Sequence, residues 1–582
     1  MSAEPDETRD ATRLVAYLVD GGGRDGSWRV PPHVVTALRG LRPLCRTLVV
    51  GVREVSPDDL SALESVADSV TVGEGLSHGR LVATLGASVE TYEQVVLTGS
   101  GWVGPVADTG AVLERMRTVA EWSLVPKGIG SPVDDGFVLA PDPDWYVLRG
   151  ERAASPELAD WRGGGALPQS ATYAFPPESF PSIDPVLMNL PALVDAGLPF
   201  VPLRAFGVDP LVADRLAVVP ADGLERLRRT GVDMREVWSA LLDRFPLRVL
   251  TANLGLTRVM AGQSQVAAST LRTAAVLHLY YDDLTDDLMD RVDLLPGEVD
   301  LVITTTDDAR RTAIEARLAA RSRQYSHEVR VVASNKGRDI SAFLVGCADV
   351  IGDDSYDLVV KLHGKRSVQD DVNASAWFRR HLFDNLLGSR AAVAELYDWF
   401  AADDSLGIAV PPVIHMYYPT MGHAWLGNRA LAERLADRLG LTVPLDEHTP
   451  VAAYGSMFVA RREALVPWLA LGLTWDDFPE GSGYADGTLA HAIERLFCYV
   501  AAGTGRYTGT VLGAAIGGIE YGFLEYKLQA VGARLPAYAI DQVAYLDGHR
   551  EPLRTVLARR LPGLADRLRP VYRWIRRRRA AP

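Results

Sequence analysis

The sequence contains few cysteines and no long apolar run. Its three cysteines, Cys45, Cys347 and Cys498, lie far apart and form no CxxC pair, which excludes a disulfide framework and a cysteine zinc site. No stretch reaches the roughly 18 apolar residues that a membrane-spanning helix needs. The first residues are acidic and polar, unlike those of a secretory signal peptide. We therefore expect a cytoplasmic protein.

Charge is distributed unevenly along the chain. The net charge is −14, yet from residue 549 onward eleven arginines stand against two acidic residues. The C-terminal segment therefore carries about +9 and the remainder about −23. An acidic body of this kind argues against a nucleic-acid-binding protein, so we expect no nucleic-acid partner.

The basic C-terminal segment, residues 546–582, contains apolar and aromatic residues between its arginines. Tyr572 and Trp574 alternate with Arg573 and the run Arg576–Arg579. Such a pattern is typical of a segment that lies on an anionic membrane surface. The alternative is a solvated tail, or one bound to the acidic body. The first interpretation predicts a peripheral protein on the inner face of the plasma membrane.

A chain of 582 residues is too long for one hydrophobic core. Strand-like apolar runs alternate with helix-like patterns, which predicts an α/β fold with mostly parallel, Rossmann-like sheets. A Pro/Gly-rich stretch interrupts the alternation. We predict an N-terminal α/β domain, a connector with a helical bridge, a C-terminal α/β domain and a basic amphipathic tail, over residues 1–162, 163–268, 269–545 and 546–582.

The two predicted domains resemble each other. Residues 70–105 align with residues 331–367, since both read as a strand, a glycine-containing loop, a helix and a Tyr-acidic-x-Val-Val strand with a polar end. We interpret them as two copies of one fold. Chance similarity between ordinary strand–helix–strand units is the alternative. The N-terminal copy lacks the basic strand end of its counterpart, so it is either degenerate or binds the acceptor.

Ligands of open α/β sheets bind beyond the carboxyl ends of the strands, where the C-terminal copy has unusual residues. The loop from Asn335 to Asp339 follows one such strand. Gly337 permits a tight turn, Asp339 is placed to accept hydrogen bonds from a base or ribose, and Lys336 and Arg338 could neutralise phosphate. The alternative is a helix start that Asp339 caps.

The next strand ends in a basic cluster. Strand alternation places Lys361, His363 and Lys365 on one side, and Arg366 follows. Together they would suit a diphosphate. The alternative is a surface loop.

Two further clusters contribute candidates. Ser456, in residues 454–461, would suit a sugar-binding wall or an ordinary core strand. Glu480 and Asp486 lie in or beside a glycine-rich loop that opens a helix, on which His491 and Arg495 are four residues apart. A carboxylate there could act as a general base or favour the helix dipole.

At these residues the sequence resembles the rhamnan synthesis protein F family. The matching motifs cover some 230 residues, and their order makes the resemblance specific for this half of the chain. They are HLYYDDL (278–284), TTTDD (304–308), NKGRD (335–339), YDLVVKLHGKRS (356–367), LGIAVPP (406–412), YGSMFVAR (454–461), DDFPE (476–480) and DGTLAHAIERL (486–496).

The resemblance implies two GT-A-like domains and a glycosyltransferase that helps to build a cell-envelope polysaccharide. The implied donor is a nucleotide sugar, dTDP-L-rhamnose above all, and the implied acceptor is a polyprenyl-linked glycan. The Asp-x-Asp metal motif usual in GT-A enzymes is missing, because the corresponding strand ends in Lys361-Leu362-His363. We therefore predict no cofactor, although a divalent cation, Mg or Mn, stays open. The hypothesis is that the basic cluster replaces the metal.

Roles follow for the candidate residues. Asp339, with Asn335, Gly337 and Arg338, would hold the nucleotide, and the basic cluster the diphosphate. Asp486, with Glu480 as second choice, would deprotonate the acceptor hydroxyl. We count Asp486, Glu480 and His363 as catalytic candidates; the binding candidates are Asn335, Gly337, Arg338, Asp339, Lys361, Lys365, Arg366, Ser456, His491 and Arg495. The competing functions are a catalytically silent, glycan-binding scaffold and a transferase with another nucleotide-linked donor.

Overall fold

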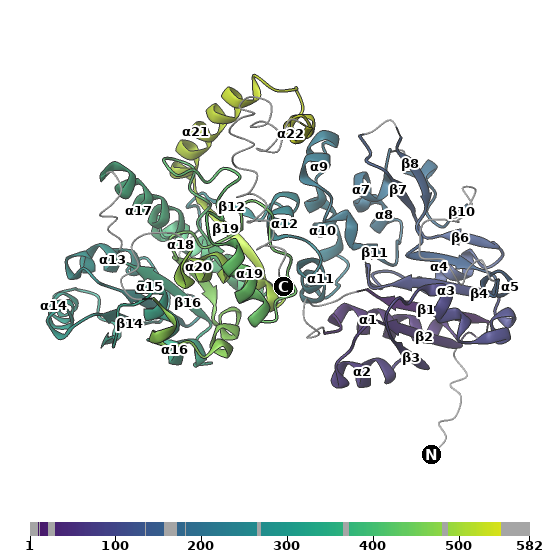
Figure 1. Ribbon diagram of the computed structural model, residues 1–582, viewed down its shortest axis with the longest axis horizontal. Helices are drawn as coiled ribbons and strands as arrows, with labels where there is room; N and C mark the ends of the chain where they lie inside the picture. Colours follow the sequence, from purple (N-terminus) through teal and green to yellow (C-terminus); the bar gives the residue numbers. More distant parts are fainter. Residues whose placement is uncertain are drawn as a thin grey trace, which may run out of the picture.

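The computed structural model describes residues 10, 12–20, 29–133, 136–155, 172–180, 182–264, 269–364, 372–479 and 487–548. Two large sheets occupy the two halves of the molecule, with a group of helices between them (Figure 1). Helices cover both sheets, so the α/β class predicted from the sequence is confirmed.

The N-terminal sheet has seven strands, and its centre is a buried apolar run. β1 (Arg13–Val19) carries the sequence RLVAYLV and is almost wholly buried, as expected for a strand covered on both faces. The order across the sheet is β10 (Thr172–Tyr173), β6 (Glu121–Ser123), β9 (Trp145–Leu148), β4 (Gln94–Gly99), β1, β2 (Thr47–Val52) and β3 (Ser69–Val72).

The C-terminal sheet has eight strands, again around a buried apolar strand. The order is β12 (Thr257–Met260), β19 (Tyr507–Gly513), β17 (Leu406–Val410), β18 (Phe458–Arg461), β16 (Leu358–His363), β13 (Thr273–His278), β14 (Val299–Thr305) and β15 (Ser326–Val331). β12 falls within the range that the sequence analysis assigned to the connector, and it extends this sheet by pairing with β19.

Apart from β12, the two sheets follow the same topology. In the N-terminal sheet, β1 lies between β2 and β4 and runs parallel to both, and β3 forms the edge. In the C-terminal sheet, β13 lies in the same way between β14 and β16, and β15 forms the edge. In the N-terminal sheet, β9 pairs antiparallel with both β4 and β6, and β6 pairs in parallel with β10. In the C-terminal sheet, β18 likewise pairs antiparallel with both β16 and β17, and β17 pairs in parallel with β19. The sheets are therefore mixed, and the alignment of residues 70–105 with 331–367 has a structural counterpart.

Helices fill the connections. In the N-terminal half and the region between the sheets they are α1 (Pro32–Leu41), α2 (Pro57–Glu64), α3 (His78–Ala83), α4 (Thr109–Arg115), α5 (Gly150–Ala153), α7 (Pro185–Met188), α8 (Leu190–Asp195), α9 (Pro210–Leu216), α10 (Pro220–Arg228), α11 (Met234–Leu242) and α12 (Leu247–Asn253). Two small sheets pair β5 (Trp102–Val103) with β11 (Val201–Pro202) and β7 (Pro126–Ile129) with β8 (Val138–Pro141).

The C-terminal half contains α13 (Thr285–Val292), α14 (Asp308–Ala319), α15 (Arg338–Leu344), α16 (Ala348–Gly352), α17 (Val372–Leu386), α18 (Arg390–Ala402), α19 (Arg429–Arg438), α20 (Leu489–Gly503), α21 (Ala514–Gly532) and α22 (Ala539–Gly548). Several begin at side-chain caps: Asp307 accepts a hydrogen bond from the Arg310 backbone at the start of α14, which satisfies an otherwise unpaired donor. No helix among the described residues is long and apolar enough to cross a membrane.

Helix α11 joins the two halves. Its Glu236 accepts a hydrogen bond from Thr36 of α1 at 2.8 Å. On the other side Arg235 donates to the backbone oxygen of Asp404 at 3.1 Å, and Trp238 packs on Tyr507 with ring centroids 4.3 Å apart. Helix α11 therefore contacts both halves of the molecule through its own side chains.

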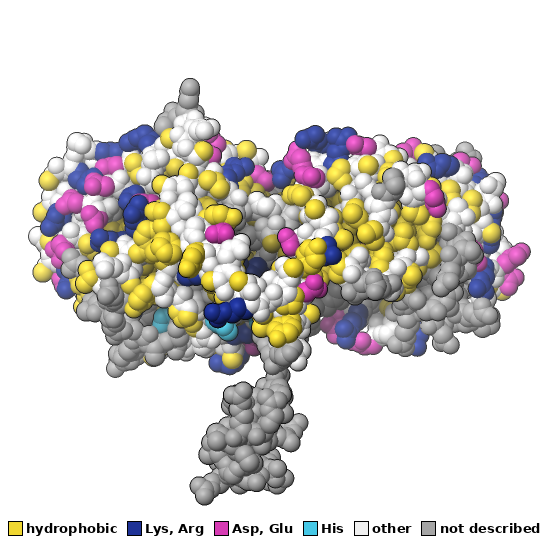
Figure 2. Space-filling view, turned by 90° about the horizontal axis from the view of Figure 1, so that it is seen from above, with side chains coloured by type: hydrophobic (Ala, Val, Ile, Leu, Met, Phe, Trp, Pro, Cys, Tyr) yellow, Lys and Arg dark blue, Asp and Glu magenta, His cyan; other side chains and the backbone are white. Residues whose placement is uncertain are grey.

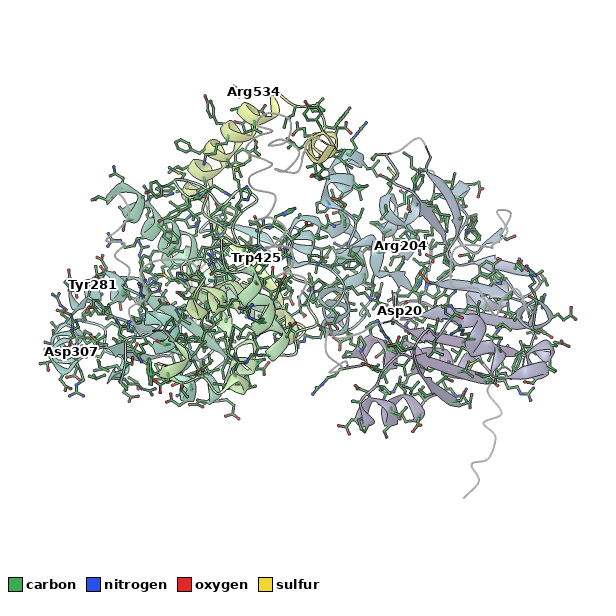
Figure 3. All side chains as sticks on the ribbon, in the orientation of Figure 1. Asp20, Arg204, Tyr281, Asp307, Trp425 and Arg534 are labelled. Atoms are coloured by element: carbon green, nitrogen blue, oxygen red, sulfur yellow. The ribbon has the colours of Figure 1, made fainter. Side chains whose placement is uncertain are left out.

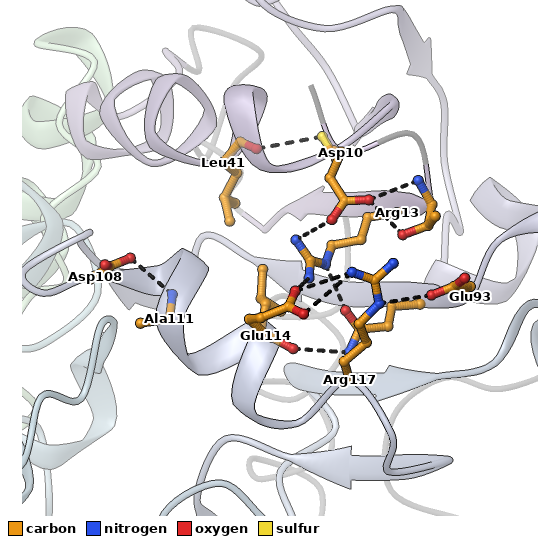
Figure 4. Close-up of polar contacts among 12 residues, drawn as sticks. Asp10, Arg13, Leu41, Glu93, Asp108, Ala111, Glu114 and Arg117 are labelled. Carbon is orange, nitrogen blue, oxygen red and sulfur yellow. Dashed lines mark hydrogen bonds and ion pairs between the residues drawn. The ribbon is translucent and has the colours of Figure 1, made fainter. Parts of the chain in front are cut away.

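A polar cluster closes the amino-terminal end of β1 (Figure 4). Arg13 is 4% exposed and contacts Asp10 at 2.8 Å and Glu114 of α4 at 3.0 Å. Arg117 joins the same cluster by binding Glu93 at 3.0 Å. This end of the sheet is thus tied to α4.

Candidate functional site

A pocket of about 630 Å³ lies at the carboxyl ends of β13 and β16 in the C-terminal half. The strands contribute His278 and His363, and surrounding loops and α20 provide the walls. Its polar and aromatic lining includes Tyr280, Tyr281, Asn335, Arg338, Asp339, Tyr418, Thr420, Tyr454, Ser456, Thr488, His491, Glu494 and Arg495. Tyr281, labelled in Figure 3, comes three residues after the end of β13. The position is the one at which open α/β sheets bind ligands.

Gly337 shapes one side of the pocket. Its φ of 74° is left-handed, and a Cβ there would lie 2.3 Å from Cδ1 of Phe478. Both the conformation and the lack of space therefore require glycine. The turn starts α15 and places Asp339 in its first turn; no side chain caps this helix. The alternative in which Asp339 serves as a helix cap is therefore wrong.

Asp339 forms the centre of a buried charge network. Its Oδ2 lies 2.7 Å from Nζ of Lys361 and also accepts a hydrogen bond from the Ser456 hydroxyl. Lys361 is 1% exposed and donates in addition to the backbone oxygen of Ser456 at 2.8 Å. Ser456 itself has a left-handed φ of 50°. The network connects β16, α15 and the loop before β18.

The charge state of Asp339 follows from these partners. Burial by itself raises the pKa of this carboxyl, but His363, Lys361 and the Ser456 hydroxyl together lower the pKa well below its usual range. Asp339 is therefore a carboxylate at neutral pH. A paired carboxylate keeps the buried ammonium of Lys361 compensated.

Two histidines lie side by side at the strand ends. His278 and His363 are register partners on the parallel strands β13 and β16. Nδ1 of His278 lies 3.0 Å from the Thr304 hydroxyl, and Nδ1 of His363 lies 3.7 Å from Asp339. Burial lowers the pKa of His278 to about 4, so this imidazole is neutral at pH 7.

Helix α20 provides the opposite wall. His491, Glu494 and Arg495 all line the pocket, as the helical spacing of these residues predicts. Arg495 is 4% exposed and donates to the backbone oxygen of Ala424 at 3.1 Å. Its guanidinium also lies over the ring of Tyr454, 4.8 Å from the centroid, and pairs with Glu494. Arg495 thus holds the wall together.

The motifs that build this pocket fall inside a family match. The family model of rhamnan synthesis protein F matches residues 175–505, which is more than half of the 582 residues. The chain belongs to the rhamnan synthesis protein F family. The resemblance drawn from the sequence motifs is confirmed.

Curated relatives share part of this segment. Over 237 residues the chain is 35% identical to the uncharacterized protein WxcX of Xanthomonas campestris pv. campestris (strain B100), covering 40% of this chain and 32% of that protein. WxcX of a second strain of the same pathovar matches equally, at 35% identity over 237 residues. The chain therefore spans about a third of the length of the curated relatives it matches.

Solved structures are similar only weakly. Mannosyl-3-phosphoglycerate synthase from Rubrobacter xylanophilus has a TM-score of 0.20 at 15% identity, covering 48% of this chain and 78% of that one. Core-mannan synthase A from Aspergillus fumigatus has a TM-score of 0.17 at 12% identity, covering 44% and 76% respectively. Likeness at these TM-scores is too low to assign a function.

Most residues predicted for this member of the rhamnan synthesis protein F family meet in one place. Asn335, Gly337, Arg338, Asp339, His363, Ser456, His491 and Arg495 line the pocket. Lys361 differs, because it does not line the pocket and instead binds Asp339 beneath the pocket surface. The predicted residues Lys365, Arg366, Glu480 and Asp486 lie outside the described part of the chain.

Several residues that line the pocket were not predicted from the sequence. His278, Tyr280 and Tyr281 belong to the HLYYDDL motif, which marked the rhamnan synthesis protein F family but was given no role at the site. The signal was available, because His278 ends a buried strand and so lies at the carboxyl edge of the sheet. Tyr418 and Thr420 come from a loop without a pattern, and nothing in the sequence indicated them.

The N-terminal half has polar contacts at the equivalent sheet edge, but they are internal. The backbone oxygen of Asp20, labelled in Figure 3, accepts a hydrogen bond from the Ser100 hydroxyl at 3.0 Å. Arg244, just beyond α11, donates to the same hydroxyl at 2.8 Å. Leu97 stands where the sequence alignment places Lys361. Whether this copy is degenerate or binds the acceptor stays a prediction.

Within the described residues, no group of three or more His, Cys, Asp or Glu side chains is arranged to hold a metal ion. In the pocket, Asp339 directs its Oδ2 toward Lys361 and Ser456.

Proposed function

We propose that this protein is a glycosyltransferase that adds a sugar from a nucleotide-linked donor to a growing polysaccharide. Membership of the rhamnan synthesis protein F family supports a role in polysaccharide synthesis. The observation that carries the proposal is the pocket of about 630 Å³ at the carboxyl ends of β13 and β16, which falls inside the matched segment. Its size suits a small polar ligand.

The finer assignment is a rhamnosyltransferase that uses dTDP-L-rhamnose on a GT-A-like domain. The family description, rhamnan synthesis, supports the sugar. Tyrosine rings and carboxylate, hydroxyl and imidazole groups along the pocket support binding of a sugar and a base, because stacking and hydrogen bonds hold such ligands.

Cationic side chains would stabilise the departing diphosphate. Arg338 lines the pocket, and the predicted Lys365 and Arg366 follow β16 in the sequence. Lys361 takes a different role from the one predicted, since its ammonium is bound to Asp339. We assign Lys361 as a positioning residue that fixes Asp339 next to His363. Charge developing on the leaving group would then meet preorganised donors.

The acceptor hydroxyl would be deprotonated by Asp486, with Glu480 as second choice. Both lie in residues 480–486, and the residues on either side, Pro479 and Thr488, line the pocket. That flanking position supports a carboxylate near the reacting atoms, as a general base requires. The proposed acceptor is a polyprenyl-linked glycan, reached from the cytoplasmic face of the membrane.

A catalytically silent scaffold is the second candidate. The observation in its favour is that the Asp339–Lys361 pair is internally satisfied, so a charge pair that could have bound a donor instead supports the fold. Such a scaffold would still bind glycan through the aromatic wall. Both candidates make opposite predictions for nucleotide-sugar binding.

A thermal-shift screen over nucleotide sugars separates them. A donor at about 100 times its Kd should add about 2.7 kcal/mol of stability, and dTDP-L-rhamnose should give the largest shift. Transfer is then measured as release of the nucleoside diphosphate in the presence of a glycan acceptor. Asp486→Asn should abolish release and keep the thermal shift, whereas Asp476→Asn, an exposed aspartate of the same region, is the matched control. No shift with any donor would favour the scaffold.

Metal dependence has its own test. Cation-side-chain assistance predicts that release of the nucleoside diphosphate continues in EDTA. Loss of activity in EDTA and its return with manganese would contradict that mechanism while leaving the glycosyltransferase assignment intact.

A further inference from the structure

Helices α21 and α22 expose an unusual amount of apolar surface. Of 23 large apolar side chains that are exposed in the described chain, ten belong to residues 514–548. They include Tyr521 at 70%, Phe523 at 52% and Tyr526 at 72% exposure. Only the first turns of α21 are buried. Apolar surface concentrated in this way marks an interaction site.

α21 projects from one side of the C-terminal half, where Arg534, labelled in Figure 3, lies just beyond its end, and α22 packs against α9. Figure 2 views the molecule from this side and shows hydrophobic side chains gathered on that face. α21 is nevertheless firmly attached. Glu520 accepts hydrogen bonds from Trp377 at 3.2 Å and His381 at 3.0 Å on α17. The exposed surface is therefore held in a fixed orientation.

We propose that α21 and α22 form a docking face for an anionic lipid bilayer. We use the name α21–α22 face for the exposed apolar side chains of the two helices, which lie on more than one side of α21. They are Ile519, Tyr521, Phe523, Tyr526, Leu528, Val531, Tyr538, Val543, Tyr545 and Leu546. Tyrosines make up four of these ten side chains, and their amphipathic rings suit the headgroup level of a membrane. The face is too short and too polar to span a bilayer, so it lies on the surface.

Charge decides between a bilayer and a second copy of this chain. The chain continues from α22 into a segment with eleven arginines and two acidic residues. A dimer formed through the α21–α22 face would bring two such segments of about +9 together, and their repulsion opposes it. Anionic headgroups instead attract them, at about 1 kcal/mol for each basic residue near the surface.

The α21–α22 face is also connected to the pocket. Nζ of Lys527 on α21 donates to the backbone oxygen of His415 at 2.7 Å, and His381 binds the backbone oxygen of Pro412 at 2.8 Å. Pro412 and His415 belong to the loop that leads to α19, and the same loop contributes Tyr418 and Thr420 to the pocket wall. Docking would therefore hold this wall near the bilayer, where a lipid-linked acceptor would enter; that last step rests on the proposed function.

Vesicle co-sedimentation of the full-length chain tests the proposal. The variant Tyr521→Gln/Phe523→Gln/Tyr526→Gln keeps the basic segment. The control Ile129→Gln/Val138→Gln removes two apolar side chains, each about half exposed, from β7 and β8. With vesicles of phosphatidylcholine and phosphatidylglycerol, the first variant should bind about tenfold more weakly than wild type, because affinity scales with buried apolar area. The control variant should bind like wild type.

Three results would overturn the docking face. They are equal binding of the α21 variant and wild type, no binding of wild type to these vesicles, and a dimer that the α21 variant converts to a monomer in gel filtration. Circular dichroism checks that both variants fold. With a short water-soluble acceptor and no vesicles, the α21 variant should release nucleoside diphosphate at the wild-type rate. Absence of release from every protein would refute the glycosyltransferase assignment and leave the vesicle result standing.

Discussion

Asp339 and Lys361 form a buried ion pair, 2.7 Å from Oδ2 to Nζ, that connects the start of α15 with the end of β16. Asp339 faces the pocket and Lys361 does not. The pair therefore determines where one wall of the pocket stands relative to the sheet. In the N-terminal half the sequence alignment places Leu97 at the position of Lys361, so the repeated fold does not itself require the charge.

Breaking this pair on one side should be costly. Lys361→Leu leaves the Asp339 carboxylate buried without its cation, which should reduce the free energy of unfolding by about 3–5 kcal/mol. The double variant Lys361→Leu/Asp339→Asn should lose less, because no charge remains uncompensated. Urea denaturation of wild type, both single variants and the double variant gives the coupling energy. Additive losses would show that the two side chains do not interact.

Gly337→Ala should be more destabilising than an ordinary exchange at a left-handed glycine. Strain from a positive φ costs about 1 kcal/mol, and the new Cβ would also meet Phe478 at 2.3 Å. Gly472→Ala is the matched control, since its φ is 55° and no atom lies within 4 Å of its Cβ position. We expect Gly337→Ala to cost about 1–3 kcal/mol more. Equal melting temperatures for the two variants would contradict the predicted clash.

The fold could be predicted largely from the sequence, because buried apolar runs such as those in β1 and β13 indicate strands whatever their partners. The direction of each strand could not be predicted in this way. β9 and β18 run antiparallel to their neighbours, and this depends on the course of the connecting chain, which local pattern does not encode. The alignment of residues 70–105 with residues 331–367 indicated that the two sheets share a strand order. No sequence pattern indicated that β12 would extend the C-terminal sheet.

Site residues were predictable where they sit at strand ends or helix starts, as for His363 and Arg338. The role of Lys361 was not, because it depends on Asp339 and Ser456, which are 22 and 95 residues away. Alternation correctly placed Lys361 and His363 on one side of β16, and both approach Asp339. Strand alternation does not predict how deep each side chain lies below the pocket surface, so it could not separate the buried Lys361 from His363, which lines the pocket.

Arg495→Lys should loosen the wall that α20 forms. The guanidinium donates to the backbone oxygen of Ala424 and lies over Tyr454, and a lysine ammonium cannot make both planar contacts. We expect the thermal shift produced by dTDP-L-rhamnose to fall severalfold, with a stability loss of about 1–3 kcal/mol. Arg434→Lys, on neighbouring α19, serves as control. An unchanged ligand response would mean that Arg495 supports the fold alone.

The pH dependence of stability should report the buried histidine His278. Burial lowers its pKa from 6.5 to about 4 in the folded protein. Between these values the unfolded chain binds a proton that the folded chain does not, so stability falls as the pH drops from about 6.5 to about 4. The full shift corresponds to about 3 kcal/mol. Above pH 6.5 both states are neutral at this residue and the effect is absent.

His278→Asn should therefore flatten the pH profile of the free energy of unfolding, which urea denaturation at pH 7.0, 6.0 and 5.0 measures. His33 in the N-terminal half offers an independent comparison, since burial lowers its pKa to about 4 as well, and His33→Asn should remove a second, additive part of the slope. Exchange of the exposed His327 controls for the loss of a histidine. A wild-type slope in the His278 variant would mean that this imidazole has about the same pKa in the folded and the unfolded protein, which would contradict the effect of burial.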